Sequence, residues 1–599
     1  MNGKRLVLIS FLLIETAIIL YTLLLKKSAV ITWKETFPSL DLLVFIPLLA
    51  TILVFTVLFL WRSHNRIFSF SSRSTLIILL LTLAIGASLR FQMPLRHYLF
   101  EDEHLYMHYA QMMNESGIPA QCGFGTFEGD QLTCLLQDGL VGGIQLRSGY
   151  TFLLAGMFQL LGENNELAAF SLNLLLGILT ILLVFFIGRE LWSEYAGLFA
   201  AILVAVLPVH VWFSGTTSLD VPGIFFLLAG LLTFLLSARK KNYDLYSFSF
   251  LLVAYAAFIR PEIVVVIPFL VTFTLADRNL LSLLWQSWRN TLITIVVSLV
   301  IGTNIITSIV NRFTYFSAEA AQGYSMFSWE YFQENFIINA RYHLSVRDYF
   351  LALILIGALL GTYRLLHRKA WGNVLLFGGM AGTLFLTNTA YLYGGYELER
   401  LLTIRLAMGW IILLAILAGI GFAALQRRSK RLVFITLALF LVLLPTYLHT
   451  HQSDFIPTMH DFDTVQAWRA RVAFQEKNPQ CLYINDIPPT DILQGYSSTD
   501  YSRFLQAMET HNKAVTDQPC IVFFEGSSCR ERARKTCNLI LTQYSWEKVP
   551  YSHIPTWQFI SKTKQEEITL LIPHSSALRS QTQSMFQIIN AKLAGLFEK

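Results

Sequence analysis

Three carboxylates stand together at Glu101, Asp102 and Glu103, directly after a hydrophobic stretch, residues 75–91, that is long enough to cross a bilayer. Acidic side chains that cluster where a membrane helix emerges into water are costly unless they stay solvated or take part in chemistry. A carboxylate in such a place can accept a proton from a reacting hydroxyl group. The position of this acidic run makes it the first candidate site in the chain.

The residues from Asp102 to Gly117 (DEHLYMHYAQMMNESG) are predicted to form a short helix. Asp102 and Tyr106 share a face of it, because residues four apart are neighbours on a helix. An apolar stripe on this helix could lie on the membrane bundle, and it consists of Leu105, Tyr109, Met112 and Met113. The alternative is that Asp102 and Glu103 only complement the dipole of the first helical turn.

A second acidic residue, Asp220, stands just before Val221 and Pro222, at the mouth of two hydrophobic spans. An Asp before a Pro-initiated helix is also an ordinary helix cap, so this alternative stays open. Candidate cations near the same membrane face are Arg260, Arg400 and Arg405. Arginine near a helix end often only extends its charged head to the interface. The functional alternative is that these planar guanidinium groups bind a phosphate.

The elements that must position these residues are membrane helices. The chain has 599 residues, of which 54% are hydrophobic and only 14% charged, whereas a soluble protein carries about 25% charged residues. Since a helix of about 20 apolar residues spans the hydrocarbon core, we predict about thirteen spans, at 6–25, 38–60, 75–91, 165–187, 195–213, 221–238, 245–259, 262–276, 291–310, 349–366, 372–391, 401–424 and 432–447. The first is interpreted as a retained membrane helix and not as a signal peptide.

The distribution of positive charge predicts an orientation. Basic clusters lie between the spans, at residues 62–73, 239–241, 364–369 and 427–431. Because short loops rich in Lys and Arg stay cytoplasmic, we place the N-terminus inside and the loop 93–148 and the tail 449–599 outside. Three lysines form an exception on the outer side, namely Lys26, Lys27 and Lys34. The clusters are short and separated by spans, which argues against nucleic-acid binding.

All six cysteines lie in segments that this topology places outside, two in the loop and four in the tail, namely Cys122, Cys134, Cys481, Cys520, Cys529 and Cys537. An even number in each segment favours disulfides in an oxidising compartment. Unpaired thiols are the alternative. Zinc binding is less favoured, because no Cys-x-x-Cys spacing occurs,.

These patterns divide the chain into two N-terminal membrane helices in 1–74, a membrane module in 75–448 with the outer loop 93–148, and a soluble extracytoplasmic domain in 449–599. The last part is expected to be α/β, because short strand-like runs alternate with polar helical stretches. The runs are 481–484 and 520–524, and the clearest helical stretch is 499–513.

Two short features interrupt the membrane module. The segment 148–162 is apolar but too short to span, so an interfacial or re-entrant helix is expected,. The spans on either side of Arg260-Pro261-Glu262 leave almost no room for a loop. Because Pro261 disfavours helix at Arg260, a tight hairpin or a pair of short helices is expected there.

The stretch DEHLYMHYA (102–110) resembles the Asp-Glu-x-x-Tyr motif in the first outer loop of glycosyltransferases with the GT-C fold. The closest branch is the superfamily of protein O-mannosyltransferases and aminoarabinose transferases. The order of features agrees, since a short apolar helix, several spans and the hairpin at Arg260 follow the motif. The resemblance covers residues 75–280, with a weaker echo at 396–425. Members move one sugar from a polyprenyl-phosphate carrier to an acceptor outside the cytoplasm.

The resemblance implies roles for the acidic residues. Asp102 corresponds to the general base and Glu103 to its partner in the motif, whereas Glu101 is incidental. Asp220 corresponds to the Asp that opens a span near the site, and Tyr106 would line the same site.

The resemblance also implies a donor site. Arg400 corresponds to the basic residue that contacts the phosphate of the lipid donor, and Arg405 and Arg260 stay candidates for the same contact from their positions. The segment 214–220 (SGTTSLD) lacks the Arg of the Ser-Arg-x-x-x-Leu-Asp pattern of eukaryotic protein O-mannosyltransferases. This departure argues against that branch and puts a protein acceptor in doubt.

The expected protein is therefore a polytopic α-helical membrane protein with a GT-C-like bundle and an extracytoplasmic α/β domain. The expected reaction is the inverting transfer of a hexosyl or pentosyl group from a dolichyl or undecaprenyl phosphate to a glycan, lipid or protein in the cell envelope. No cofactor is required. A divalent metal could bind to three acids of the outer loop, which more simply solvate that loop, namely Glu128, Asp130 and Asp138.

Three other functions stay open. A transferase or ligase of pyrophosphate-linked oligosaccharides would depend on a divalent metal held by several acids. A transporter or lipid flippase would show charges at the bilayer midplane and repeated halves, and this sequence has few such charges and no visible repeat. A receptor or scaffold would need less membrane than this chain contains.

Overall fold

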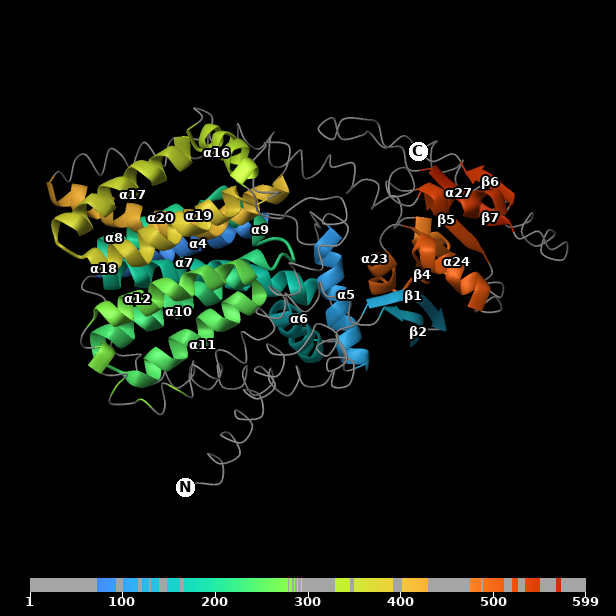
Figure 1. Ribbon diagram of the computed structural model, residues 1–599, viewed down its shortest axis with the longest axis horizontal. Helices are drawn as coiled ribbons and strands as arrows, with labels where there is room; N and C mark the ends of the chain where they lie inside the picture. Colours follow the sequence, from blue (N-terminus) through green and yellow to red (C-terminus); the bar gives the residue numbers. More distant parts are fainter. Residues whose placement is uncertain are drawn as a thin grey trace, which may run out of the picture. The chain divides into compact units, whose positions relative to one another are not determined.

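The protein is described from a computed structural model of the chain. The described residues are 73–92, 101–116, 121–128, 131–138, 148–161, 166–277, 329–344, 349–391, 401–428, 474–485, 488–510, 520–525, 534–543, 545–549 and 567–572, with isolated positions between 280 and 292. The chain divides into two compact units, one of helices and one built on a sheet (Figure 1). The helical unit comprises 1–97, 141–161 and 165–445, and the sheet unit comprises 98–140, 162–164 and 446–599.

Four helices among the described residues are long and apolar enough to cross a membrane, namely α4 (Arg73–Gln92), α7 (Glu166–Leu191), α10 (Asp220–Lys240) and α20 (Leu401–Arg428). They coincide with four of the predicted spans. Most side chains of α10 and α20 are buried within the unit, whereas most of α4 is exposed. The apolar surface of α4 suits contact with lipid chains, since soluble proteins rarely expose a large apolar patch.

Shorter helices complete the helical unit, and they are α6 (Ser148–Leu161), α8 (Glu194–Ala205), α9 (Pro208–Phe213), α11 (Tyr243–Ile259), α12 (Ile267–Ala276), α16 (Trp329–Leu344), α17 (Tyr349–His367), α18 (Trp371–Asn373) and α19 (Met380–Thr389). The short helix predicted at 148–162 is present as α6. Between α11 and α12, Arg260 is extended, with φ −129° and ψ 102°, and a 3₁₀ turn (Pro261–Val266) follows. This is the break that Pro261 predicts, because its ring clashes with a helical residue before it.

The prediction of one continuous span at 195–213 is wrong. The segment forms two helices, α8 and α9, which are separated at Val206 and Leu207. Pro208 is the reason, because proline lacks the N–H group that a continuous helix requires and fits the first turn of a new one. The predicted span 372–391 also departs from a regular helix, since a π turn (Val374–Gly379) precedes α19.

Several predicted spans lie outside the described residues, namely 6–25, 38–60, 432–447 and, apart from Leu292, 291–310. The number of thirteen spans therefore stays a prediction. The same holds for the two N-terminal helices assigned to 1–74.

The helices α17 and α20 pack closely through glycine. A Cβ atom at Gly361 would lie 1.9 Å from the carbonyl oxygen of Leu417, so only glycine allows this approach of the two backbones. Small residues at helix contacts are typical of membrane bundles, where dispersion contacts and not water exclusion drive association. The contact fixes α20, which carries one of the predicted site residues.

The sheet unit contains one seven-stranded sheet in the order β2-β1-β4-β3-β5-β7-β6. Its strands are β1 (Gln121–Glu128), β2 (Gln131–Asp138), β3 (Leu482–Ile484), β4 (Ser498–Thr499), β5 (Ile521–Glu525), β6 (Ser545–Val549) and β7 (Glu567–Ile572). β3 is parallel to β4 and β5, and the other pairs are antiparallel. Its helices are α5 (Glu101–Ser116), α23 (Pro488–Leu493), α24 (Tyr501–Thr510) and α27 (Arg534–Gln543). The strand-like runs of the tail are thus β3 and β5.

The hairpin of the outer loop joins this sheet. Phe124 of β1 pairs with Thr499 of β4, and the Phe124 side chain is buried against Leu482, Phe504 and Phe523 in one hydrophobic cluster. The loop 93–148 was predicted as part of the membrane module, whereas residues 98–140 lie in the sheet unit. Pairing explains this, because a two-stranded hairpin is only marginally stable without a sheet or helix to cover it.

Disulfides link strands within the sheet unit. Cys122 on β1 is bonded to Cys134 on β2, and Cys481 is bonded to Cys520 at the start of β3 and β5. Cys537 on α27 is also disulfide-bonded, and Cys529 lies outside the described residues.

Candidate functional site

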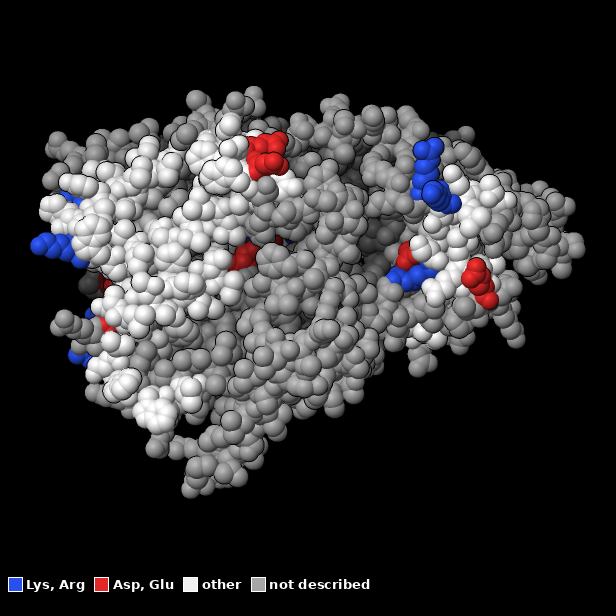
Figure 2. Space-filling model, in the orientation of Figure 1, with Lys and Arg blue, Asp and Glu red and all other residues white. Residues whose placement is uncertain are grey.

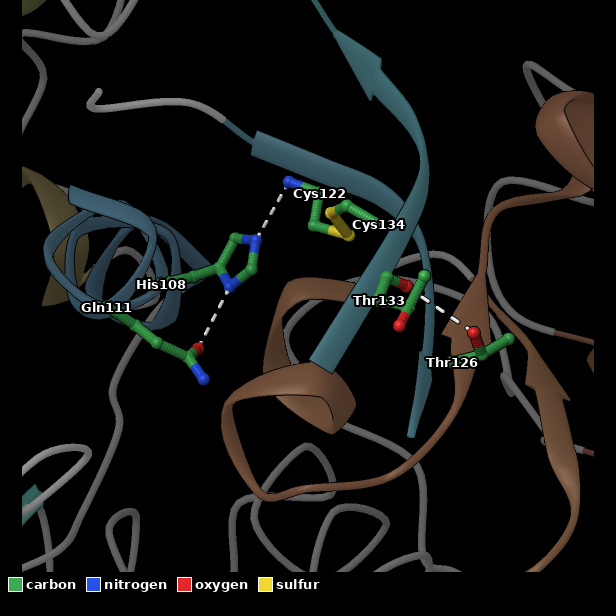
Figure 3. The surroundings of a disulfide bond; sticks show 6 residues. All are labelled: His108, Gln111, Cys122, Thr126, Thr133 and Cys134. Atoms are coloured by element: carbon green, nitrogen blue, oxygen red, sulfur yellow. Dashed lines mark hydrogen bonds between the residues drawn. A yellow bond between two sulfur atoms is a disulfide. The ribbon is translucent and has the colours of Figure 1, made fainter. Parts of the chain in front are cut away.

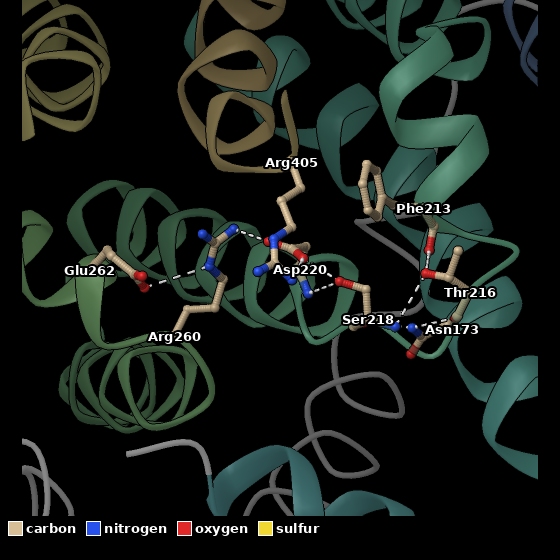
Figure 4. Close-up of polar contacts among 8 residues, drawn as sticks. All are labelled: Asn173, Phe213, Thr216, Ser218, Asp220, Arg260, Glu262 and Arg405. Carbon is tan, nitrogen blue, oxygen red and sulfur yellow. Dashed lines mark hydrogen bonds and ion pairs between the residues drawn. The ribbon is translucent and has the colours of Figure 1, made fainter. Parts of the chain in front are cut away.

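Asp220 is at the centre of a buried charged cluster in the helical unit (Figure 4). It begins α10, but the cap position is Leu219 and no side chain caps the helix, so the ordinary-cap interpretation is wrong. The carboxylate instead pairs with Arg260 Nη1 and accepts a hydrogen bond from the Ser218 hydroxyl, and Arg405 Nη1 lies 4.0 Å from Oδ2. One carboxylate therefore pairs closely with Arg260 and lies near a second guanidinium group, that of Arg405.

Arg260 reaches Asp220 from the break between α11 and the 3₁₀ turn. A Cβ atom at Gly223 would lie 2.9 Å from Arg260 Cγ, so the absence of a side chain there lets the arginine stem cross the first turn of α10. The Nε atom of Arg260 lies 3.6 Å from Oε2 of Glu262, beyond hydrogen-bond distance,. Pro261 thus positions the arginine by breaking the helix, and Gly223 leaves room for it.

Arg405 reaches the same carboxylate from the start of α20. The Asn388 amide at the end of α19 donates a hydrogen bond to the carbonyl oxygen of Leu406, which ties α19 to this turn of α20. Many of the bundle's helices lie between Asp220 and Arg405 along the chain, and the packing of α20 brings the two residues together. Of the three predicted cations, Arg260 and Arg405 converge, and Arg400 lies outside the described residues.

Exposure differs within this cluster in a way that matters for binding. The side chain of Asp220 is 1% exposed and that of Arg260 is 7% exposed, whereas Arg405 is 16% and Glu262 26% exposed. A buried pair is retained only when its desolvation is offset by charge and hydrogen bonds. Arg405 is thus the more exposed of the two arginines in the cluster.

The acidic helix lies in the other unit. Asp102 is in the first turn of α5, where its side chain is outside the described residues. Glu103 and Tyr106 on the same helix are buried in the sheet unit, at 0% and 4% exposure. The structure thus places Asp102, Glu103 and Tyr106 on one helix of one unit, and Asp220, Arg260 and Arg405 in one cluster of the other. The predicted helix itself is confirmed.

The apolar stripe of this helix packs partly on the C-terminal segment. Met112 shares a hydrophobic cluster with Cys122 and Ile492, and α5 contacts both α23 and β1. The stripe was expected to lie on the membrane bundle, and its contact with Ile492 of α23 was not predicted. Sequence reasoning missed it because Ile492 is far away along the chain.

A buried histidine fastens α5 to β1 (Figure 3). His108 Nε2 accepts a hydrogen bond from the backbone N–H of Cys122 at 2.9 Å, so Nδ1 carries the ring proton and donates to Gln111 Oε1 at 3.3 Å. Burial lowers the pKa of His108 to about 4, although the Gln111 contact opposes this shift. The ring is therefore neutral, and its role is to join a helix to a strand.

A metal site is absent from the part of the chain that the structure describes. No group of three or more His, Cys, Asp or Glu side chains that could hold an ion occurs there. Of the three loop acids, Asp130 lies outside the described residues, and nothing is known of the side chains of Glu128 and Asp138.

Three polar residues at Asp220 and along the segment before it were not predicted. Ser218 donates to the carboxylate, Asn173 bonds the backbone before it, and Arg90 bonds Ser214 at 3.2 Å. Two of them had a signal, because Asn173 and Arg90 are polar residues in apolar spans, and such residues are expensive unless they are paired.

A segment of the helical unit matches a known family. Residues 149–306 match the sequence profile described as dolichyl-phosphate-mannose-protein mannosyltransferase. This segment contains Asp220 and Arg260. In a comparison with curated protein sequences, nothing matches the chain. The family resemblance predicted from the motifs is confirmed by this match.

The fold is similar to that of ArnT from Cupriavidus metallidurans. The apo structure has a TM-score of 0.52 and 12% identity, and the match covers 84% of this chain and 98% of that one. The structure bound to undecaprenyl phosphate has a TM-score of 0.50 and 14% identity, with 85% and 99% covered. An oligosaccharyltransferase from Archaeoglobus fulgidus reaches a TM-score of 0.46 at 13% identity, with 76% and 68% covered. The ArnT structures establish the predicted GT-C fold.

Proposed function

We propose that this protein is a multi-pass membrane glycosyltransferase that transfers one sugar from a polyprenyl phosphate to an extracytoplasmic acceptor, with inversion at the anomeric carbon. The observation that carries the proposal is the convergence of Arg260 and Arg405 on the single buried carboxylate of Asp220. This cluster lies in a bundle with the GT-C fold, and two of its residues are in the segment that matches a mannosyltransferase family.

The cluster suits a phosphate. Guanidinium groups bind phosphate oxygens through planar, paired hydrogen bonds, and a fixed orientation strengthens that geometry. Asp220 supplies the fixed orientation, and the partial exposure of Arg405 leaves it accessible. A related structure of the same fold, ArnT, is described as bound to undecaprenyl phosphate, which supports a lipid monophosphate as the donor.

Charge supports an extracytoplasmic position for the cluster. α10 starts at Asp220 and ends at Lys240, a length of about 30 Å, which equals the hydrocarbon thickness of a bilayer. Basic side chains gather at the opposite end of the helical unit, where α17 and α18 lie (Figure 2). They include Arg239, Lys240, Lys241, Arg364, Arg368 and Lys369. The end of a membrane bundle that is rich in Lys and Arg faces the cytoplasm. We therefore propose that Asp220, at the other end of α10, lies near the outer face of the membrane.

The proposed step uses Asp102 as general base. The acceptor oxygen attacks the anomeric carbon, the bond from that carbon to the phosphate oxygen breaks, and the hydroxyl proton passes to the Asp102 carboxylate. The polyprenyl phosphate leaves with the bonding electron pair, and Arg405, Arg260 and Arg400 stabilise its charge. Glu103 supports the base, and Tyr106 lines the site. Attack from the side opposite the departing phosphate inverts the configuration at the anomeric carbon.

The experiment is a transfer assay with the purified full chain and defined polyprenyl-phosphate sugars, followed by mass spectrometry of the product and determination of its anomeric configuration. Asp102→Asn should lower the rate at least about 100-fold, the usual contribution of a positioned base. Glu101→Gln is the matched control, because it removes a neighbouring charge in the same run.

Three results would change the proposal. Full activity of Asp102→Asn would remove Asp102 from the role of base. Transfer only from a diphosphate-linked donor, with loss on chelation of divalent metals, would favour the oligosaccharide transferase. A product with retained configuration would exclude direct displacement.

A further inference from the structure

The connection between α9 and α10, residues 214–219, is irregular and buried along its whole length. Ser214, Thr217 and Ser218 are 0% exposed and Thr216 is 1% exposed. Irregular backbone usually lies at the surface, because buried N–H and C=O groups need partners that a loop does not supply. Turn bonds to α9 and within the connection satisfy part of its backbone, and neighbouring helices supply further partners. The connection leads directly into Asp220.

One amide supplies two of those partners. Asn173, a buried residue in the middle of α7, donates from Nδ2 to the carbonyl oxygen of Thr216 at 2.8 Å and to that of Ser218 at 2.6 Å (Figure 4). Its Oδ1 accepts from the Tyr150 hydroxyl at 3.3 Å, which fixes which side of the amide faces the connection. Ser218, held in this way, donates its hydroxyl to Asp220.

The start of the connection is held from another helix. Arg90 on α4 is fully buried, and its Nε donates to the Ser214 hydroxyl at 3.2 Å. Its Nη1 donates to the carbonyl oxygens of Gly86 at 2.7 Å and Ala205 at 3.0 Å. These bonds anchor Ser214 to α4 and to the end of α8. Asn173 acts two to four residues further on, next to the charged cluster.

We infer that Asn173 is a positioning residue for the phosphate site: its amide holds the buried connection 214–219 so that Ser218 and Asp220 orient Arg260 and Arg405. Asn173 contacts the backbone of the connection and none of the charged groups directly. The inference rests on the proposed function for its effect on catalysis, but its effect on the cluster can be measured without any reaction.

The first test labels arginines with a dicarbonyl reagent and counts modified peptides by mass spectrometry. The variant is Asn173→Leu, which keeps the approximate size and removes both hydrogen bonds. We expect Arg260 to be modified about tenfold faster, since two buried carbonyl groups lose their donor and the connection moves. Arg239, whose side chain is 71% exposed, is the internal standard and should react at the same rate in every variant.

Thr180→Val is the matched control. Thr180 lies on the same helix, is equally buried, and its hydroxyl bonds only the carbonyl oxygen of Leu176 at 2.8 Å, one turn before it. It removes a buried hydrogen bond from α7 without touching the connection, so Arg260 should stay as protected as in the parent.

The second test measures transfer at varied donor and acceptor concentrations. Asn173→Leu should raise KM for the lipid donor about tenfold and leave KM for the acceptor unchanged, a split that general loss of stability would not produce. If Arg260 is modified at the same rate in Asn173→Leu as in the parent, the inference is overturned. If the parent transfers no sugar, the proposed function fails while the labelling result still decides the inference.

If Asn173→Leu does not fold, Tyr150→Phe decides in its place. This change removes only the hydroxyl that orients the Asn173 amide. Faster labelling of Arg260 relative to Arg239 would support the inference, and labelling equal to the parent would overturn it.

Discussion

Buried polar side chains have different kinds of partner in the two units of this protein. In the helical unit one buried cluster is charged: Arg260, which follows α11, and Arg405 of α20 lie beside Asp220 of α10. In the sheet unit two buried titratable groups have neutral hydrogen-bond partners. The Asp491 carboxylate accepts from the Asn485 amide and from the Ser498 hydroxyl, and His108 joins α5 to β1.

The difference concerns what each arrangement can still bind. A carboxylate that meets only neutral donors closes a network and fixes local structure. A carboxylate shared by two arginines leaves cationic donors directed at a common point, which an anion can use. This contrast supports the proposal that the helical cluster binds a ligand, whereas the networks of the sheet unit stabilise its fold.

The largest expected effect separates these roles at the two buried acids. Asp220→Asn should lower sugar transfer at least about 100-fold, because Arg260 and Arg405 lose the group that orients them. It should also destabilise the helical unit by about 3–5 kcal/mol, since a buried charge is left without its partner. Asp491→Asn is the matched change in the sheet unit. Equal losses of transfer per folded molecule in both variants would break the comparison.

The next effect is confined to the sheet unit. Replacement of Cys481 and Cys520 by alanine should cost about 4 kcal/mol, and replacement of Cys122 and Cys134 about 3 kcal/mol, because the loops closed by the two bonds differ in length. Their sequence separations are 39 and 12 residues. Hydrogen exchange of β1, β3 and β5 measures the loss. Altered dicarbonyl labelling of Arg260 in either variant would contradict the separation of the two units.

A pH dependence of similar size should arise from His108. Burial lowers the pKa of His108 from 6.5 to about 4. Between these two pH values His108 is therefore protonated in the unfolded chain but neutral in the folded protein. Stability is therefore complete above pH 6.5 and falls as the pH drops towards 4, by at most about 3 kcal/mol. Hydrogen exchange of β1 between pH 7 and 4 gives the slope after correction for intrinsic exchange. The slope should disappear in His108→Gln; its persistence would assign it to another group.

The smallest effect tests the geometry of the anion site. Arg405→Lys keeps the charge and loses the planar fork, so KM for the lipid donor should rise by roughly fivefold. Arg368→Lys is the control, because Arg368 lies over the Trp192 ring, 3.8 Å from its centroid, and takes no part in the cluster. A donor KM that is the same in Arg405→Lys and the parent would remove Arg405 from the phosphate site.

Much of the fold was accessible from local sequence. The long apolar runs predicted α4, α7, α10 and α20 because burial in lipid demands continuous apolar helix. Pro261 predicted the break at Arg260 correctly, while the effect of Pro208 on the span 195–213 was overlooked. The joining of the loop hairpin to the tail was not predictable, because Phe124 and Thr499 pair across most of the chain.

The candidate site, like the fold, was predicted only in part from the sequence. Asp102, Asp220, Arg260, Arg400 and Arg405 were predicted to lie on one membrane face. Of these, the structure brings Asp220, Arg260 and Arg405 together. The Asp102 base and Arg400 stay predictions, because the Asp102 side chain and the whole of Arg400 lie outside the described residues. Asn173 was missed, since a single amide in an apolar helix does not reveal which backbone it satisfies.

The sequence by itself determined that this chain is a membrane protein, where most of its described helices lie, and which residue types stand where apolar helix meets water. These are properties of hydrophobicity, charge and proline, which act over a few residues. Only the tertiary structure decided that Asp220 lies beside two arginines instead of capping its helix, and that Asn173 bonds the buried connection before it. Such contacts join residues from α7, α10, α11 and α20, and their partners are chosen by packing.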